Sequence, residues 1–355
     1  MDVDVAVVGA GQAGLAAGYH LRRTGLDFVL LDDQPQPGGA WQHYWDSLRL
    51  FSPAAHSPLP GWWMPEQPGA EFPTARHVVD YLSAYEQRYQ LPIYRPVRVA
   101  TVHERGPRLE LTTDQGLWRT RAVISATGTW SHPHVPRYPG GDTYQGRQLH
   151  TVHYRSGHEF EGQRVVIVGG GNSAAQILAE VSQYAETLWV ARREPRFMPD
   201  DIDGRVLFDV ATRSMATRAQ GMDDTVDVSR LGDIVMVPSV RAARSRGVLK
   251  AHPMFEALTS TGVVWGQGRE QWACDAVIWC TGFRPALGHL AGMDLFDVSG
   301  HIPTTGTRAH HDPRVHLLGY GDWTGRASST IIGAGRTAKA AVRELAERVG
   351  PPRYP

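Results

Sequence analysis

The feature that most constrains the fold is a strand that runs into a glycine-rich turn. The β-branched run at 3–8 ends in Gly9, Gly11 and Gly14, and a helical stretch and a second strand at 28–31 come next. In such a turn the first glycine allows the tight bend, and the second lets a pyrophosphate approach the backbone. The third lets the helix pack closely on the strand. The order strand, turn, helix, strand predicts a dinucleotide-binding unit.

The same pattern recurs 160 residues later, counted from Gly9 to Gly169. A strand at 165–168 leads into Gly169 and Gly171, and a helix to about residue 182 and a strand at 187–191 follow. One such turn can be no more than a tight connection between a strand and a helix. Two in register predict an α/β chain with two Rossmann-like dinucleotide-binding domains.

The two copies differ in charge at the position 23 residues after the first glycine. The first copy has Asp32 there, whereas the second has Arg192, followed by Arg193. A carboxylate at this position accepts hydrogen bonds from ribose hydroxyls, and arginine accommodates a 2′-phosphate. We therefore expect FAD in the first domain and NADPH in the second.

Two apolar strands that end in Thr-Gly mark where the backbone crosses between the domains. They lead into Thr127-Gly128 and Thr281-Gly282. The NADPH domain is thus predicted to be inserted into the FAD domain. The expected boundaries are 1–155 for the first part of the FAD domain, 156–284 for the NADPH domain and 285–355 for the return segment. Helices are expected over 74–89 and 337–348, and residues 200–250 are assigned only loosely.

Composition excludes several classes of protein. The chain has 355 residues, which at ~150 per domain makes about two domains. Its 36 basic and 36 acidic side chains argue against a nucleic-acid partner and a polybasic membrane anchor. Two cysteines, Cys274 and Cys280, suit neither a disulfide framework nor a Cys-rich zinc site, so no metal is expected. No signal peptide or apolar run of ~18 residues is recognisable, which favours a cytoplasmic protein.

Aromatic residues gather in the loop that follows the first domain's second strand. Four of the eleven tryptophans, Trp41, Trp45, Trp62 and Trp63, fall within 23 residues of a proline-rich stretch. Such a group suits a flavin ring and an apolar substrate channel. The alternative is a core patch under a long loop, which we favour for any single tryptophan, whereas we favour the pocket for the group.

Several motifs together resemble the flavin-containing monooxygenases. The first glycine turn, followed by Asp32 and Gly38-Gly39-x-Trp41, resembles their N-terminal pattern. Residues 144–154, with Tyr144, Gly146, His150 and Tyr154, are similar to the identifying sequence of that family. Tyr144 stands where Phe is usual, and Tyr154 favours this group over the Baeyer–Villiger group. Residues 169–174 resemble the NADPH loop, 280–283 the C-terminal Thr-Gly element, and 45–53 and 318–325 the members encoded in bacterial arsenic-resistance operons.

The resemblance implies a monooxygenase whose flavin is reduced by NADPH and adds O2 as a C4a-(hydro)peroxide. One oxygen atom then passes to a small-molecule nucleophile, at nitrogen, sulfur or trivalent arsenic. The family's asparagine beside the flavin is replaced by Phe51, which cannot donate a side-chain hydrogen bond, and Ser52 follows it. Either Ser52 takes the role of the asparagine or the backbone and NADP⁺ do, and Phe51 and Ser52 are the catalytic candidates. The implied cofactor-binding residues are Gly9, Gly11, Gln12, Ala13, Gly14, Asp32, Gly39, Ala40, Trp41, Thr127, Gly128, Asp322, Gly169, Gly171, Asn172, Ser173, Ala174, Arg192, Arg193, Thr281 and Gly282.

Other functions stay open from the residues alone. A pyridine-nucleotide–disulfide reductase shares the layout but needs a dithiol beside the flavin, and residues 38–41 contain no cysteine. A flavin reductase or an NADPH-sensing regulatory flavoprotein would lack the oxygen-transfer step. His150 is expected to be a structural hydrogen-bonding residue rather than a proton shuttle. The sequence leaves a homodimer open.

Overall fold

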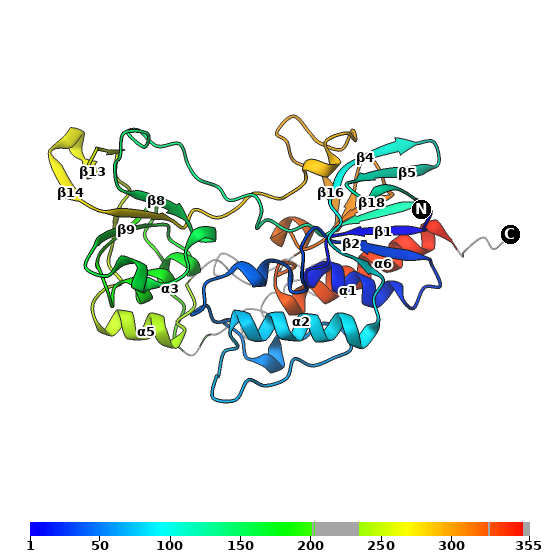
Figure 1. The fold of residues 1–355 in the computed structure, drawn as a ribbon, viewed down its shortest axis with the longest axis horizontal. Coiled ribbons are helices and arrows are strands. Elements are labelled where there is room, and N and C mark those ends of the chain that lie inside the picture. The colour runs from blue at the N-terminus through cyan, green and yellow to red at the C-terminus, as the bar shows by residue number, and fades with distance from the viewer. Residues whose placement is uncertain (201, 203–233, 326, 351–355) are drawn as a thin grey trace, which may run out of the picture. The chain divides into compact units, whose positions relative to one another are not determined.

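The computed structural model describes residues 1–200, 202, 234–325 and 327–350 (Figure 1). The chain divides into two compact units. The first unit comprises Met1–Gln42, Pro53–His132 and Pro285–Pro355, and the second comprises His43–Ser52 and Pro133–Arg284. The chain therefore leaves the first unit and returns to it, which confirms the predicted insertion of one Rossmann-like domain into another.

The first unit is built on a sheet of seven strands in the order β16-β17-β18-β7-β1-β2-β3. Strand β1 pairs in parallel with β2 and β7, and β7 pairs in parallel with β18. All four residues of β1 and of β7 are buried, as expected for central strands covered on both faces. The strands are β1 Val5–Val8, β2 Phe28–Leu31, β3 Ile93–Tyr94, β7 Ala122–Ser125, β16 Thr304–Thr305, β17 Arg308–Ala309 and β18 Val315–Leu317.

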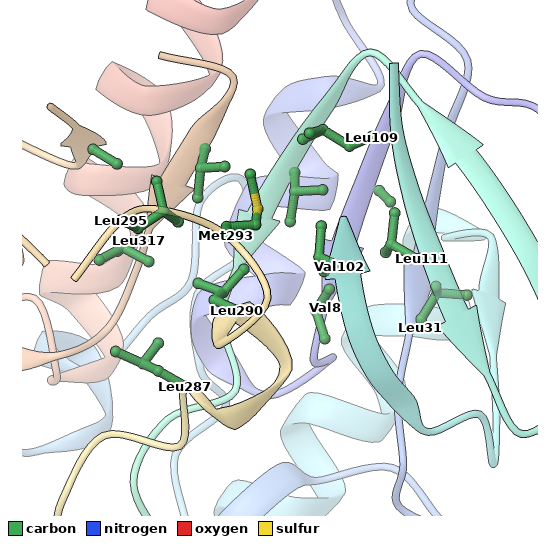
Figure 2. Packing of buried hydrophobic residues seen from close by; sticks show 14 of the residues in the cluster. Val8, Leu31, Val102, Leu109, Leu111, Leu287, Leu290, Met293, Leu295 and Leu317 are labelled. Atoms are coloured by element: carbon green, nitrogen blue, oxygen red, sulfur yellow. The ribbon is translucent and has the colours of Figure 1, made fainter. Parts of the chain in front are cut away.

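One face of this sheet packs on a small antiparallel sheet. Strands β4 Val99–Arg105, β5 Arg108–Thr113 and β6 Gly116–Thr120 form it. Figure 2 shows Val8 and Leu31 of the parallel sheet near Val102 and Leu111, with Leu290 closing the cluster from the return segment. Burial of these apolar side chains fixes the return segment onto the first unit.

Three helices complete the first unit: α1 Gln12–Leu21, α2 Ala75–Tyr89 and α6 Ile331–Val349. Helix α1 lies against α6 (Figure 1). The expected helix over 74–89 is present, and Thr74 is its N-cap, with Oγ1 accepting a bond from His77 N at 3.1 Å.

The closing helix begins earlier than the predicted residue 337. Thr330 caps α6 by accepting from Gly333 N at 3.1 Å. A Cβ on Gly333 would overlap the Ala327 carbonyl oxygen, and a Cβ on Gly335 would lie 2.7 Å from Pro60 Cγ. These two glycines interrupt the apolar pattern in the first turn of the helix, although they also allow this turn to pack closely.

The second unit is built on a parallel sheet of five strands in the order β11-β10-β9-β15-β8. Helices α3 Asn172–Val181 and α5 Pro238–Ser245 belong to it. A separate antiparallel sheet holds β12 Ala257–Leu258, β13 Gly262–Trp265 and β14 Glu270–Ala273. The parallel strands are β8 Arg147–His150, β9 Arg164–Val168, β10 Glu186–Ala191, β11 Ala251–Pro253 and β15 Ala276–Trp279.

The unit boundaries differ from the expected ones at two places. Residues 133–155 group with the second unit, because β8 pairs in parallel with β15 over four residues. Residues 43–52 also group with the second unit, although they follow β2 in sequence. Of the loosely assigned stretch 200–250, residues 201 and 203–233 lie outside the described residues, whereas α5 lies within them.

Candidate functional site

The first glycine turn has the geometry that a bound pyrophosphate requires. Gly9 has a φ of +99°, and a Cβ there would lie 2.6 Å from the Ala126 carbonyl oxygen. A Cβ on Gly14 would overlap the carbonyl oxygen of Gly9, so α1 can pack on β1 only with glycine here. At Gly11, by contrast, the nearest atom to such a Cβ is Gly39 Cα at 3.9 Å, and the approach to the backbone is open.

The start of α1 leaves its amide groups available to an anion. Its N-cap is Gly11, which provides no side-chain cap, whereas Thr74 and Thr330 cap α2 and α6. Uncapped N–H groups at a helix N-terminus, together with the helix dipole, favour phosphate. Because its N–H groups are uncapped, this first turn, which contains Ala13, fits the nucleotide that the sequence predicts.

The backbone at Gly38-Gly39 lies directly beside this turn. A Cβ on Gly39 would lie 2.9 Å from Gly11 Cα. Trp41 Nε1 donates to Gln12 Oε1 at 2.9 Å, and Gln12 Nε2 donates to the Ser329 carbonyl at 2.6 Å. The fold thus brings predicted residues from two distant motifs together, with Ala40 between them in the 3₁₀ helix Gly39–His43.

Asp32 follows β2 and is buried in an ion-pair cluster that sequence reasoning missed. Its Oδ2 lies 2.7 Å from Arg95 Nε, and its Oδ1 accepts from Ala10 N at 3.4 Å. Arg95 also donates to Glu86 on α2, at 3.0 and 3.2 Å. Burial raises the pKa of Asp32, and the guanidinium of Arg95 opposes this shift. The carboxylate is held in place by a residue 63 positions away.

A second polar network joins the loops after β7 and β18. Tyr320 Oη lies 2.8 Å from Thr127 Oγ1 and 2.9 Å from Ser125 Oγ. Ser125 Oγ in turn lies 3.1 Å from His289 Nε2. Burial lowers the pKa of His289 to about 4, so its ring is neutral at pH 7. The parallel pairing of β7 with β18 places Thr127-Gly128 near the loop that carries Asp322, which itself is exposed.

The glycine turn of the second unit repeats the open approach. Gly169 has a φ of +137°, and a Cβ there would overlap the Cys280 carbonyl oxygen. No atom lies within 4 Å of a Cβ built on Gly171. Helix α3 starts at Asn172 without a side-chain cap, and Ser173 and Ala174 complete its first turn. Asn172 Oδ1 accepts from Val235 N at 2.9 Å.

Arg192 and Arg193 follow the carboxyl end of β10, and both are exposed. In a parallel Rossmann sheet this edge is the one that faces a bound nucleotide. Their place therefore fits a 2′-phosphate partner.

The second Thr-Gly element is tied to the histidine of residues 144–154. Thr281 Oγ1 donates to the His134 carbonyl, and His150 Nε2 lies 3.0 Å from the Gly282 carbonyl oxygen. His150 Nδ1 accepts from Val152 N at 3.3 Å. Burial lowers the pKa of His150. Both ring nitrogens are engaged by backbone groups, which agrees with a structural role.

The four tryptophans are divided between the two units, so the pocket that we favoured for the group stays a prediction. Trp41 bonds to Gln12, and Trp45 is fully buried in the second unit against Tyr154. Trp62 packs on α2, with its ring 5.2 Å from that of Tyr81, while Trp63 is 71% exposed. Helix α2 holds the loop backbone at this point, because Tyr81 donates to the Trp62 carbonyl at 2.8 Å.

The catalytic candidates Phe51 and Ser52 end the segment 43–52 and are half-buried. Within the described residues, no group of three or more His, Cys, Asp or Glu side chains could hold a metal ion. None of the helices in the described ranges combines the length and the apolar character that a membrane span needs.

Two Rossmann-like units, one inserted into the other and each with an open glycine turn, define a class of flavoproteins that use two dinucleotides. A family model for pyridine nucleotide-disulphide oxidoreductases matches residues 6–231. A flavin-containing monooxygenase from Stenotrophomonas maltophilia is 50% identical, with a TM-score of 0.89, and the match covers 98% of this chain and 99% of that one. The chain belongs to the pyridine nucleotide-disulphide oxidoreductase family and, within it, to the flavin-containing monooxygenases.

Two further similarities cover almost the whole chain. The uncharacterized oxidoreductase CzcO of Bacillus velezensis is 31% identical over 350 residues, which cover 96% of this chain and 99% of that protein. The bacillithiol disulfide reductase of Bacillus cereus is 18% identical, with a TM-score of 0.73 over 98% of this chain and all of that one, and shows the shared fold. Membership of the family implies that the chain is an oxidoreductase that uses FAD and NADPH, as predicted.

Proposed function

We propose that this flavin monooxygenase transfers one oxygen atom of O2 to a soft nucleophile, at nitrogen, sulfur or trivalent arsenic. FAD would bind at the glycine turn of the first unit and NADPH at that of the second. When bound, the flavin supplies the redox and oxygen chemistry. The protein contributes binding, orientation and the exclusion of water.

The observation that carries the proposal is the place of the two cysteines. Both are free thiols of the second unit. Burial raises the pKa of the Cys280 thiol to about 12 and also raises that of Cys274, whose neighbour is the Tyr144 hydroxyl. Disulfide exchange needs a thiolate. The corner against Gly11 instead carries Gly39, so oxygen chemistry is favoured over dithiol chemistry.

The residues of the first site would then have separate tasks. The backbone at Gly11 and the start of α1 would bind the pyrophosphate, and Asp32 would accept from the ribose. The ring of Phe51 has no hydrogen-bond donor, whereas the hydroxyl of Ser52 can donate. In place of the family's asparagine, a hydrogen bond to the flavin would come either from Ser52 or from the backbone and NADP⁺.

The substrate class follows from the chemistry rather than from a shaped pocket. An oxygen atom transferred from a flavin goes to a polarisable lone pair, as on a thioether, an amine or trivalent arsenic. A tight arsenite site would use sulfur ligands, in line with the preference of soft ions for thiolates. With Cys274 buried and Cys280 poorly ionised, an arsenic substrate would bind transiently or as a thiol adduct.

The test follows NADPH oxidation and O2 uptake with a panel of amines, thioethers, thiols, arsenite and methylarsenite, with identification of each product. We expect one oxygenated product per NADPH for at least one class. The variant Cys274→Ser with Cys280→Ser should keep this activity. Hydrogen peroxide as the sole product with every compound, or disulfide reduction that the double variant lacks, would contradict the proposal.

A further inference from the structure

The segment His43–Ser52 has a sequence position that conflicts with its packing. It follows β2 and precedes α2, both of which belong to the first unit, yet its own contacts place it in the second. The chain enters the second unit for ten residues and leaves it again, and the catalytic candidates Phe51 and Ser52 stand at the end of this excursion.

Two polar anchors hold the segment. Arg155 Nη1 donates to the His43 carbonyl at 2.7 Å. Ser47 Oγ donates to Glu180 Oε2 at 2.5 Å. The other oxygen of Glu180 accepts from Gly157 N at 3.0 Å, so the carboxylate is fixed from both sides.

An aromatic anchor lies between these two. The indole of Trp45 meets the ring of Tyr154 edge to face, with centroids 5.9 Å apart, and Tyr154 stacks on Phe160. Trp45 is 1% exposed and Tyr154 is fully buried. Burial of a whole tryptophan is a large apolar contribution, and the edge-to-face pair adds to it.

The partners of the segment are parts of the nucleotide-binding machinery of the second unit. Glu180 lies near the end of α3, the helix that starts just after the open turn at Gly171. Arg155 and Tyr154 lie directly after the β8 strand and the short helix Thr151–His153. The segment is therefore fastened to the helix whose other end faces the proposed phosphate.

We propose that Ser47, Trp45 and Glu180 are positioning residues that make segment 43–52 a part of the nicotinamide-binding unit. Phe51 and Ser52 would then respond to binding of the nicotinamide nucleotide rather than of FAD. The inference rests on the proposed function for the roles of Phe51 and Ser52. The attachment itself does not depend on those roles.

Hydrogen exchange of the FAD-loaded enzyme, measured with and without NADP⁺, tests the attachment. In the wild type we expect exchange in a peptide covering 43–52 to slow when NADP⁺ binds. In Ser47→Ala the segment should exchange about tenfold faster, as for the loss of one charge-assisted hydrogen bond, and NADP⁺ should no longer slow it. Ser47→Thr keeps the hydroxyl and should behave as the wild type.

Two controls accompany this measurement. Glu186→Gln removes an exposed ion pair between Glu186 and Arg164, the first residues of β10 and β9. This variant should leave exchange in the segment unchanged. Exchange in β1 reports whether a variant has lost the fold as a whole. Wild-type exchange of the segment in Ser47→Ala, or exchange in the wild type that NADP⁺ leaves unchanged, would overturn the inference.

Turnover provides a separate readout. If Ser47 positions Ser52, Ser47→Ala should lower the amount of product per NADPH and raise peroxide. A merely structural serine would not move this ratio. If no substrate is oxygenated by the wild type, the proposed function fails, whereas the exchange measurement still decides whether the segment belongs to the second unit.

Discussion

Arg95 and Asp32 form a buried ion pair in which Arg95 Nε lies 2.7 Å from Asp32 Oδ2, with side chains 11% and 5% exposed. The same guanidinium binds Glu86 through two nitrogens. One cation thus serves two carboxylates, one directly after β2 and one on α2. The arrangement holds the predicted ribose acceptor at the carboxyl end of β2.

Replacement of Arg95 should therefore affect both stability and FAD binding. Arg95→Ala leaves the buried Asp32 and the half-buried Glu86 without their cation, which costs about 3–5 kcal/mol of unfolding free energy. We expect a lower urea midpoint of the apoprotein and weaker FAD binding by fluorescence titration. Arg76→Ala, which breaks an exposed pair with Asp80 on the same helix, is the matched control and should change neither quantity appreciably. An unchanged midpoint for Arg95→Ala would show that the cluster contributes nothing.

Because the space beside Gly171 is open, a substitution there should weaken NADPH binding without destabilising the fold. Gly171→Ala adds a methyl group where no atom lies within 4 Å, so the variant should unfold like the wild type. The methyl group would stand where the phosphates approach, and we expect KM for NADPH to rise roughly tenfold or more with normal FAD content.

Gly14→Ala is the contrasting variant, because its Cβ would overlap the Gly9 carbonyl oxygen. Overpacking of this kind costs about 1–3 kcal/mol or more, so the variant should be destabilised. Thermal unfolding and steady-state kinetics of both variants check the pair. If Gly14→Ala and Gly171→Ala lost equal stability, the space beside Gly171 would not be open.

The exposed arginines after β10 should select NADPH over NADH. Arg192→Ala, and Arg193→Ala, each remove a charged donor to the 2′-phosphate, and we expect the ratio of kcat/KM for the two nucleotides to fall roughly tenfold or more. Arg147→Ala, which removes an arginine paired with Glu159 at the start of β8, should leave the ratio unchanged. A constant ratio in all three variants would exclude the arginines as the source of specificity.

Two buried histidines make the fold sensitive to mild acid. Burial lowers the pKa values of His289 and His316 to about 4, against ~6.5 in an unfolded chain. The unfolded state then binds protons that the native state does not, so stability is complete above about pH 6.5 and falls as the pH drops toward 4. Each histidine contributes about 3 kcal/mol to this loss.

Urea midpoints measured across this pH range check the expectation. His316→Gln should flatten the pH dependence, since glutamine does not titrate. His132→Gln, at an exposed position, should leave the slope as in the wild type. A midpoint that stays constant between neutral pH and pH 4.5 would contradict the role of the two buried imidazoles.

Local sequence was sufficient for the parts of the fold that depend on neighbouring residues. The glycines at 9, 14 and 169 stand where the backbone allows no Cβ, and a strand and a helix flank each turn. Helix α2 was predicted within one residue, because its apolar spacing and Thr74 cap are both local signals. The start of α6 was predicted six residues too late, because its glycines break the apolar pattern.

Contacts between distant residues could not be predicted in the same way. Arg95 meets Asp32 only because β3 pairs with β2, and Tyr320 meets Thr127 only because β18 pairs with β7. Trp45 lies near Trp41 in sequence and belongs to a different unit. Nothing in the spacing of the tryptophans shows which partner each ring will find.

The sequence by itself determined that the chain has two Rossmann-like domains, one inserted within the other, and it predicted opposite charge preferences for their glycine turns. These follow from steric limits on a few consecutive residues and from the chemistry of Asp32, Arg192 and Arg193. Only the tertiary structure decided which side chains support those turns and to which unit the segment 43–52 belongs. The physical reason is that strand pairing and burial join residues over separations such as 63 and 193 positions, and no local pattern records such pairing.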